Sequence, residues 1–290
     1  MNNARLGIPL MIATTFVFAI QDGLSQYLAR EYNTVVVVMI RYWFFAAFVI
    51  ALSASRKGGI RRVAATSQPF LQILRGVILV AEICVMVIAF VHLGLVASHA
   101  VFASYPLLAA ALSGPILGEK VGPRRWVAIG IGFIGVLIIL RPGFTIFAPE
   151  ALIPLLSASM FAIYGLLTRY AARKDSAETS FFWTGVSGAV AITLIGIFFW
   201  EPIQGNDWWF MGMLCLTGAG GHFLLIKAYD VAEVSTVQPF AYFQLVFAAS
   251  IGMAVFGETA DLWMIIGAGL IIASGLFTFW RERQKSKVTS

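Results

Sequence analysis

Four charged residues stand inside otherwise apolar stretches and are the first candidates for chemistry: Asp22, Arg41, Arg75 and Glu82. A charge at membrane depth costs roughly 2.5–3.5 kcal/mol, so such residues should face other helices or a water-filled cavity. One interpretation is structural: Asp22 pairs with Arg41, while Arg75 and Glu82, on one helix face, find partners inside the protein. The other is proton coupling, in which Asp22 or Glu82 exchanges a proton, because desolvation favours the neutral carboxyl group.

A second group consists of amide, phenol and imidazole side chains near the middle of the apolar runs. Such residues either line a cavity for a small molecule or form hydrogen bonds between helices, each worth about 0.6 kcal/mol. We expect six of them to line a substrate cavity: Gln21, Tyr105, Tyr164, His222, Tyr242 and Gln244.

The sequence holds no motif of a catalytic, metal or cofactor site. His92, His99 and His222 are scattered without ligand spacing, and Cys84 and Cys215 lie in apolar runs, where a free thiol behaves as a small hydrophobe. The stretch "GIGFIG" at 130–135 fits a dinucleotide-binding pattern literally, but no strand precedes it, so its glycines indicate helix packing. We therefore expect no enzyme, no metal, no cofactor and no nucleic-acid partner.

The elements that must position these residues are membrane helices. The 290 residues are 60% hydrophobic and 12% charged, with a mean hydropathy of +0.87, whereas soluble domains are about 25% charged. Spanning helices need about 20 mainly apolar residues. Ten such runs are present, at 7–28, 34–54, 70–91, 95–117, 125–140, 150–168, 180–199, 208–228, 234–256 and 262–280.

Two apolar runs end in Gly-Glu, at Glu119 and Glu258. Shifting the chain by this spacing lays Ala89–Glu119 over Ala228–Glu258 without a gap and puts Tyr105 opposite Gln244. Five helices per copy is an odd number, so the second copy must be inverted, as in many transporters. We predict an all-α membrane protein with repeats at 1–143 and 144–290, and Glu119 and Glu258 at helix ends on opposite faces.

The distribution of Lys and Arg predicts how the chain is oriented. If the N-terminus is cytoplasmic, the outer loops hold only Arg30 and Arg141, whereas basic clusters such as Arg56–Lys57 and Arg61–Arg62 fall inside. By the positive-inside rule, both termini face the cytoplasm. This predicts a multi-pass protein of a bacterial inner membrane, with the lipid bilayer and a small-molecule substrate as partners and no obligatory protein partner.

The stretches "ASYPLLAAALSGPILGE", "AYFQLVFAASIGMAVFGE" and "MIRYWFFAAFVI", the last containing Arg41, resemble the drug/metabolite transporter superfamily and its EamA-type exporters. Within it, the whole chain is similar to YddG-type bacterial aromatic amino-acid exporters. The second copy departs from the family pattern because Leu245 stands opposite Pro106, so its fourth helix is expected to lack a kink.

The resemblance implies a secondary transporter that exports small organic metabolites by alternating access around a cavity between the repeats. Amino acids, aromatic or otherwise hydrophobic, are the expected substrates. Two alternatives remain at this point: a transporter of sugar phosphates or nucleotide sugars, and a sensor or assembly subunit that moves nothing. Proton antiport and facilitated diffusion also both remain open.

Overall fold

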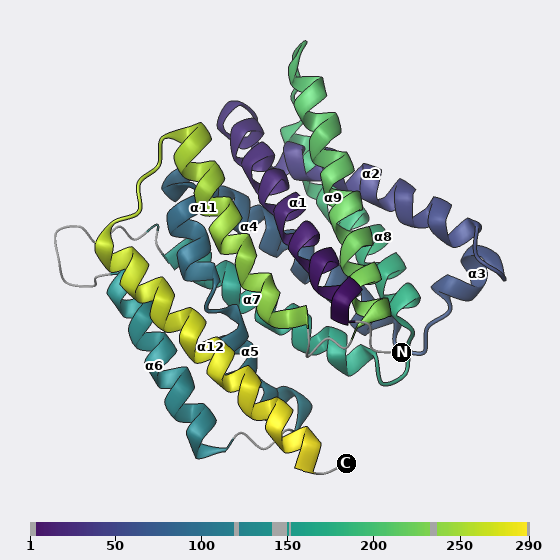
Figure 1. The fold of residues 1–290 in the computed structure, drawn as a ribbon. Coiled ribbons are helices and arrows are strands. Elements are labelled where there is room, and N and C mark those ends of the chain that lie inside the picture. Colours follow the sequence, from purple (N-terminus) through teal and green to yellow (C-terminus); the bar gives the residue numbers. More distant parts are fainter. Residues whose placement is uncertain (1–3, 119–121, 141–149, 151, 233–236, 289–290) are drawn as a thin grey trace.

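The computed structural model describes residues 4–118, 122–140, 150, 152–232 and 237–288 (Figure 1). Every regular element within these ranges is a helix. Three residues used in the sequence-based predictions lie outside these described ranges: Glu119, Lys120 and Arg141. The elements of the first half are α1 (Ala4–Glu31), α2 (Thr34–Ala54), the short α3 (Gly59–Ala64), α4 (Pro69–Phe102), α5 (Tyr105–Leu117) and α6 (Pro123–Leu140).

The second half follows the same order without a counterpart of α3. Its elements are α7 (Leu152–Ala171), α8 (Ala177–Gly196) with the 3₁₀ turn η2 (Ile197–Phe199), α9 (Asp207–Val231), the 3₁₀ turn η3 (Gln238–Tyr242), α11 (Phe243–Phe256) and α12 (Leu262–Val288). Within the described residues, seven helices are long and apolar enough to cross a membrane, and three shorter apolar helices join them. The expected ten-helix membrane fold is confirmed.

The predicted third and fourth spans share α4, which is interrupted at Gly94 with φ +81° and ψ 176°. The fourth span continues as α5, which begins just before Pro106, a residue suited to the first turn of a helix. Its counterpart changes from 3₁₀ to α geometry between Tyr242 and Phe243, the equivalent position. The ninth span is therefore not one regular α-helix, although Leu245 replaces the proline.

Contacts between the two halves follow an inverted two-fold pattern. Helix α1 packs against α9 and α11, and its repeat counterpart α7 packs against α4 and α5. Two further pairs join equivalent helices, α2 with α8 and α6 with α12. Figure 1 shows α6 and α12 side by side at one edge of the bundle. Both copies thus contribute to every layer of the bundle, so its centre lies between the repeats.

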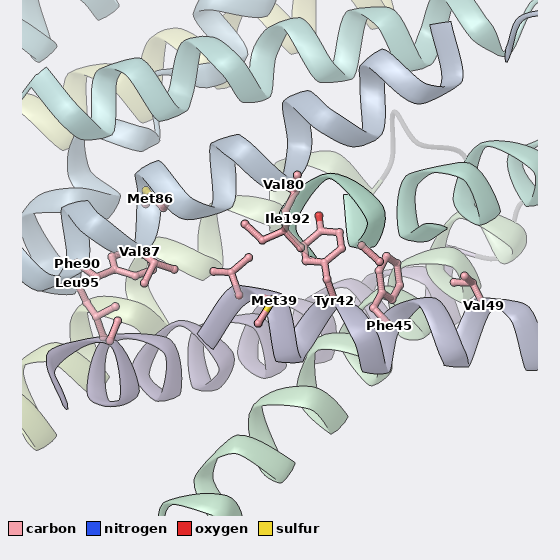
Figure 2. Packing of buried hydrophobic residues seen from close by; sticks show 13 residues of the cluster. Met39, Tyr42, Phe45, Val49, Val80, Met86, Val87, Phe90, Leu95 and Ile192 are labelled. Carbon is pink, nitrogen blue, oxygen red and sulfur yellow. The ribbon is translucent and has the colours of Figure 1, made fainter. Parts of the chain in front are cut away.

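The largest apolar cluster joins α2, α4 and α8, and Figure 2 shows Met39, Tyr42 and Val80 within it. Because lipid gives little hydrophobic drive for helix association, small residues must let backbones approach. Gly188 does this: a Cβ there would lie 2.3 Å from Cε1 of Tyr42. Two of the glycines at 130–135 act similarly: a Cβ on Gly132 would lie 2.0 Å from Cδ1 of Leu107, and one on Gly135 would lie 2.6 Å from the Gly267 carbonyl oxygen.

Replacing Gly188 with alanine should lower thermal stability by about 1–3 kcal/mol, because the added methyl group would overlap a buried ring. The measurement is the melting temperature of the detergent-solubilised protein. Gly212→Ala in α9 is the matched control, since a Cβ there meets nothing within 4 Å. Equal melting temperatures for the two variants would contradict this packing.

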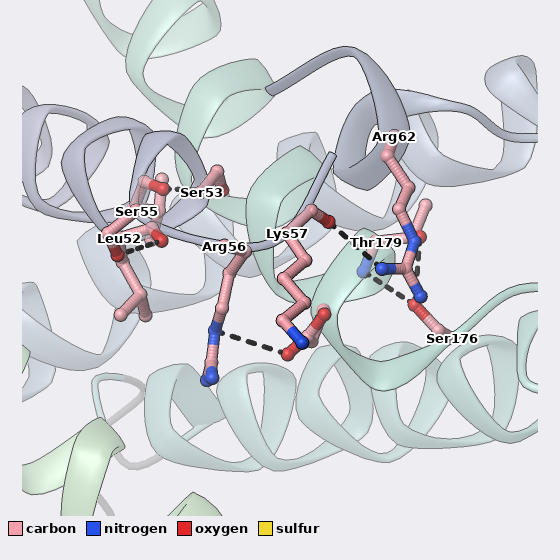
Figure 3. Close-up of polar contacts among 10 residues, drawn as sticks. Leu52, Ser53, Ser55, Arg56, Lys57, Arg62, Ser176 and Thr179 are labelled. Atoms are coloured by element: carbon pink, nitrogen blue, oxygen red, sulfur yellow. Dashed lines mark hydrogen bonds and ion pairs between the residues drawn. The ribbon is translucent and has the colours of Figure 1, made fainter. Parts of the chain in front are cut away.

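One end of the bundle, which we call the basic end, carries Arg56, Lys57, Arg61 and Arg62 between α2 and α4, and Arg173 and Lys174 after α7. Arg56 pairs there with Glu178 at 3.3 Å (Figure 3). Helix α8 starts there with a cap in which Ser176 Oγ accepts from the Thr179 N–H at 3.1 Å.

The loop before α8 is tied to α4 through Asp175. Thr66 Oγ1 and Gln72 Nε2 donate to its Oδ2 at 2.5 and 2.7 Å. Partial burial opposes ionisation, but hydrogen bonds from Thr66, Gln72, the Ser67 N–H and Gln68 outweigh it and hold the pKa of Asp175 below its usual value. The carboxylate is therefore an anchor between the two repeats.

Replacing Asp175 with alanine should lower thermal stability by about 1–2 kcal/mol at neutral pH, because Thr66 and Gln72 lose their acceptor. A lowered pKa means that the stabilisation is present above the usual aspartate pKa and disappears as pH falls through the lowered one. Melting temperatures of both proteins should therefore converge in acid. A constant difference down to the lowest tolerated pH would contradict the assignment.

Candidate functional site

A central cavity of about 80 Å³ lies between the repeats. Tyr105, at the start of α5, and Gln244, in α11, both line it although they come from different copies. Tyr242 lines it as well, and its hydroxyl fits against Gly275, where a Cβ would lie 1.9 Å from the oxygen. The remaining walls are mainly apolar: Phe102, Ala103, Pro106, Pro239, Ala241, Leu245 and Leu276.

A polar cluster borders this cavity. Asp22 of α1 accepts a hydrogen bond from Gln244 Nε2 at 2.9 Å, and the same oxygen lies 3.1 Å from Nε2 of His99. The His99 ring stacks on Phe90 with centroids 5.3 Å apart, which fixes its plane. The expected Asp22–Arg41 pair is therefore wrong, because α1 turns Asp22 towards α4 and α11. Sequence analysis missed His99, and nothing in its spacing would have signalled this role.

A second cavity, of about 290 Å³, lies between α2, α4, α7, α8 and α9. We call it the vestibule, because its lining reaches Arg56 and Glu178, which are exposed at the basic end. Tyr164 and His222, two of the expected cavity residues, line the vestibule rather than the central cavity. The six expected residues are thus divided between two cavities, with Gln21 lining neither.

Arg75 forms part of the vestibule wall and is held by its neighbours. Its Nε donates to Thr168 Oγ1 at 3.0 Å, Nη1 donates to Gln72 Oε1, and the guanidinium carbon lies 5.3 Å from the Tyr164 ring centre. Glu82, two turns further along α4, accepts from Ser157 Oγ at 2.6 Å. Each therefore has its own partner on α7, and the two do not pair with each other in the described chain.

The end opposite the vestibule is closed by a contact between the halves. After Gly94, the second part of α4 begins with free backbone N–H groups, and Glu258 accepts from those of Leu95 and Val96 at 3.0 and 2.9 Å. Gln26 Nε2 donates to the same carboxylate at 2.9 Å. A Cβ at residue 94 would lie 2.4 Å from the Glu258 carboxyl carbon, so the position requires glycine.

We call this set of contacts the Glu258 latch. The sequence places Glu258 just beyond a helix end, which is correct, but its role as a cap for another helix was missed. The available signal is the glycine at 94, which lies at the expected start of the fourth span. A carboxylate at a helix N-terminus also interacts favourably with the helix dipole.

An inverted repeat of membrane helices with cavities between its halves is the architecture of secondary transporters. The model of the EamA-like transporter family matches residues 5–141 and 149–280, so the chain belongs to this family. It is a multi-pass membrane transporter of small metabolites and not an enzyme.

Three relatives show the range of the family. The chain is 26% identical to an S-adenosylmethionine uptake transporter of Rickettsia prowazekii, over 96% of this chain and 94% of that protein. It is 30% identical to a riboflavin transporter of Vibrio cholerae with the same coverage. It is 23% identical to the pseudopaline exporter CntI of Pseudomonas aeruginosa, over 93% and 94%.

A solved crystal structure superposes with a TM-score of 0.61 at 18% identity, covering 94% of this chain and 98% of the other. It supports the fold alone. These relatives place the chain in the EamA-like family but give no specific support to the narrower resemblance to YddG-type exporters.

Proposed function

We propose that this protein moves amino acids with aromatic or other hydrophobic side chains across a bacterial cytoplasmic membrane by alternating access. The observation that carries the proposal is the central cavity, whose aromatic and apolar walls come from both repeats and include the polar side chains of His99 and Gln244, both in contact with Asp22. Pockets for small metabolites combine mainly apolar walls with a few polar groups in this way. In the part of the chain that the structure describes, the Tyr242 hydroxyl is buried against Gly275 and has no hydrogen-bond partner.

The relatives are compatible with such a substrate. S-adenosylmethionine contains an amino acid and an aromatic base, and riboflavin contains an aromatic ring system, so an aromatic cavity suits both. The direction of transport is proposed as export from the basic end, which the positive-inside rule makes cytoplasmic. The vestibule then faces the cytoplasm and the Glu258 latch closes the outer side.

The test is flux of labelled tryptophan, phenylalanine, threonine, riboflavin and a sugar phosphate into liposomes containing the purified protein. We expect saturable flux of the aromatic amino acids and none of the sugar phosphate. Flux of riboflavin or the sugar phosphate without any amino acid would overturn the substrate assignment while leaving the transporter fold intact.

We propose that any proton coupling passes through Asp22 rather than Glu82, because Asp22 contacts Gln244 and His99, which line the central cavity, whereas Glu82 is held by Ser157 on α7. An imposed pH gradient should accelerate flux through the wild type and should have no effect on Asp22→Asn. Ser157→Ala, which removes the partner of Glu82, should keep the acceleration. A pH gradient that leaves wild-type flux unchanged would rule out obligatory antiport.

A further inference from the structure

Arg41 is a buried cation for which the described part of the chain offers no hydrogen-bond or ion-pair partner. Its side chain lies in the interior of the bundle on α2, with 8% of its surface exposed. Among the described residues it forms no hydrogen bond and no ion pair. Asp22 accepts a hydrogen bond from Gln244 and lies 3.1 Å from His99 Nε2, and Glu82 accepts a hydrogen bond from Ser157. Among the described residues the guanidinium of Arg41 therefore contacts no carboxylate, although Glu82 lies near enough to interact with it electrostatically.

Arg41 borders a small cavity with mainly apolar walls, formed by Tyr42, Phe45, Leu79, Ile83, Cys215 and Ala219. Gly218 leaves room beside it: a Cβ there would lie 3.4 Å from Arg41 Nε and 3.3 Å from Oε1 of Gln21. That Gln21 oxygen is also buried without a partner in the described chain. Two unsatisfied polar groups of different helices therefore face the same space.

The size of this cavity limits what can occupy it. Its volume is about 10 Å³, close to what one water-sized group needs. His222 lines both this cavity and the vestibule, so the two spaces are neighbours. Its Nδ1 is 2.8 Å from the Gly218 carbonyl oxygen and must donate to it, which holds the ring at the boundary. A space of this size takes one water-sized group, such as a single carboxylate oxygen, so the rest of a ligand would have to lie in the vestibule.

The chemistry of that end group follows from the charge. A buried, unpaired guanidinium is costly, and an anion that enters offsets this cost. A guanidinium donates a charge-assisted hydrogen bond to a carboxylate oxygen, which is stronger than a bond between neutral groups. We propose that Arg41 is an entry subsite that binds the carboxylate of a substrate arriving through the vestibule, before the substrate reaches the central cavity. This inference rests on the proposed function for the identity of the substrate. It adds that the carboxylate is the group of the substrate that is recognised first.

The test compares ligands that differ only in the charge of this group. Binding of phenylalanine, phenylalaninamide, hydrocinnamate and hydrocinnamide to the purified protein is measured by isothermal titration calorimetry, for wild type, Arg41→Gln, Arg41→Lys and the exposed-surface control Arg61→Gln. We expect each acid to bind the wild type at least about 10-fold more tightly than its amide, which is the effect of one charge-assisted hydrogen bond. Arg41→Gln should remove this preference, Arg41→Lys should retain part of it, and Arg61→Gln should keep it.

Each outcome separates this inference from the proposed function. If the protein prefers hydrocinnamate over hydrocinnamide, loses this preference in Arg41→Gln, and does not bind phenylalanine, the carboxylate subsite is supported and the amino-acid assignment is overturned. Phenylalanine binding with no preference over its amide would overturn the subsite and leave the assignment standing. If Arg41→Gln fails to fold, Arg41→Lys decides. An undiminished preference for the acids over their amides in this variant, with unchanged affinity for both acids, overturns the contact with the guanidinium. Absence of binding by any acid overturns the subsite.

Discussion

Replacing Glu258 with alanine should lower the thermal stability of the protein by about 2–4 kcal/mol, one of the two largest effects we expect. The variant leaves the N–H groups of Leu95 and Val96 without their acceptor and also removes the partner of Gln26. It breaks a contact between the two halves at the closed end. Transport should therefore also change, because the latch is one of the contacts that must open when the cavity faces the other side.

The matched control for the latch is Glu178→Ala at the basic end. Glu178 is also a carboxylate in a contact between helices of different repeats, but its ion pair with Arg56 is half exposed and should contribute only about 0–1 kcal/mol. Thermal melting followed by intrinsic fluorescence measures both variants. If Glu258→Ala melts no lower than Glu178→Ala, the latch does not stabilise the fold.

Replacing Gln244 with alanine should reduce transport at least about 10-fold while lowering thermal stability by only about 1 kcal/mol. The amide lines the central cavity and donates to Asp22, so its loss removes a polar group from the cavity and frees the carboxylate. If Gln244 served only in packing, its replacement would reduce the amount of folded protein and the transport activity by the same factor. Initial rates of substrate flux, normalised to the amount of folded protein in the liposomes, separate these cases.

Val246→Ala is the control for Gln244, since Val246 lies two residues further along α11 with 54% of its surface exposed. It should transport at the wild-type rate. Equal rates for Gln244→Ala and Val246→Ala would remove Gln244 from the functional site.

The sequence predicted the spans and the repeat because both depend on local patterns. Apolar runs of membrane length define the helices, and the register between Glu119 and Glu258 places Tyr105 and Gln244 at equivalent positions. In the structure both line one cavity. That agreement follows from the inverted symmetry, which brings equivalent positions of the two copies to the centre.

The partners of the charged residues could not be predicted in the same way. They depend on how each helix is rotated about its axis, and almost continuous apolar runs carry little information about rotation. Asp22 and Gln21 are neighbours in sequence, yet Asp22 contacts His99 while Gln21 lies near Arg41 and Gly218. The role of Glu258 as a helix cap could be predicted only with knowledge of the interruption of α4 at Gly94. In the sequence, Gly94 looks like an ordinary loop glycine.

The most direct test of the central claim, that substrate crosses through the cavity between the repeats, is counterflow of labelled phenylalanine into liposomes preloaded with unlabelled phenylalanine. Gly275→Leu fills the space taken by Tyr242, and Gly269→Leu is its control on the same helix, where a Cβ meets nothing within 4 Å. We predict transient accumulation with the wild type and Gly269→Leu, and none per folded molecule with Gly275→Leu, whose side chain must displace Tyr242. Equal accumulation in all three, or none with folded wild type, would contradict this account.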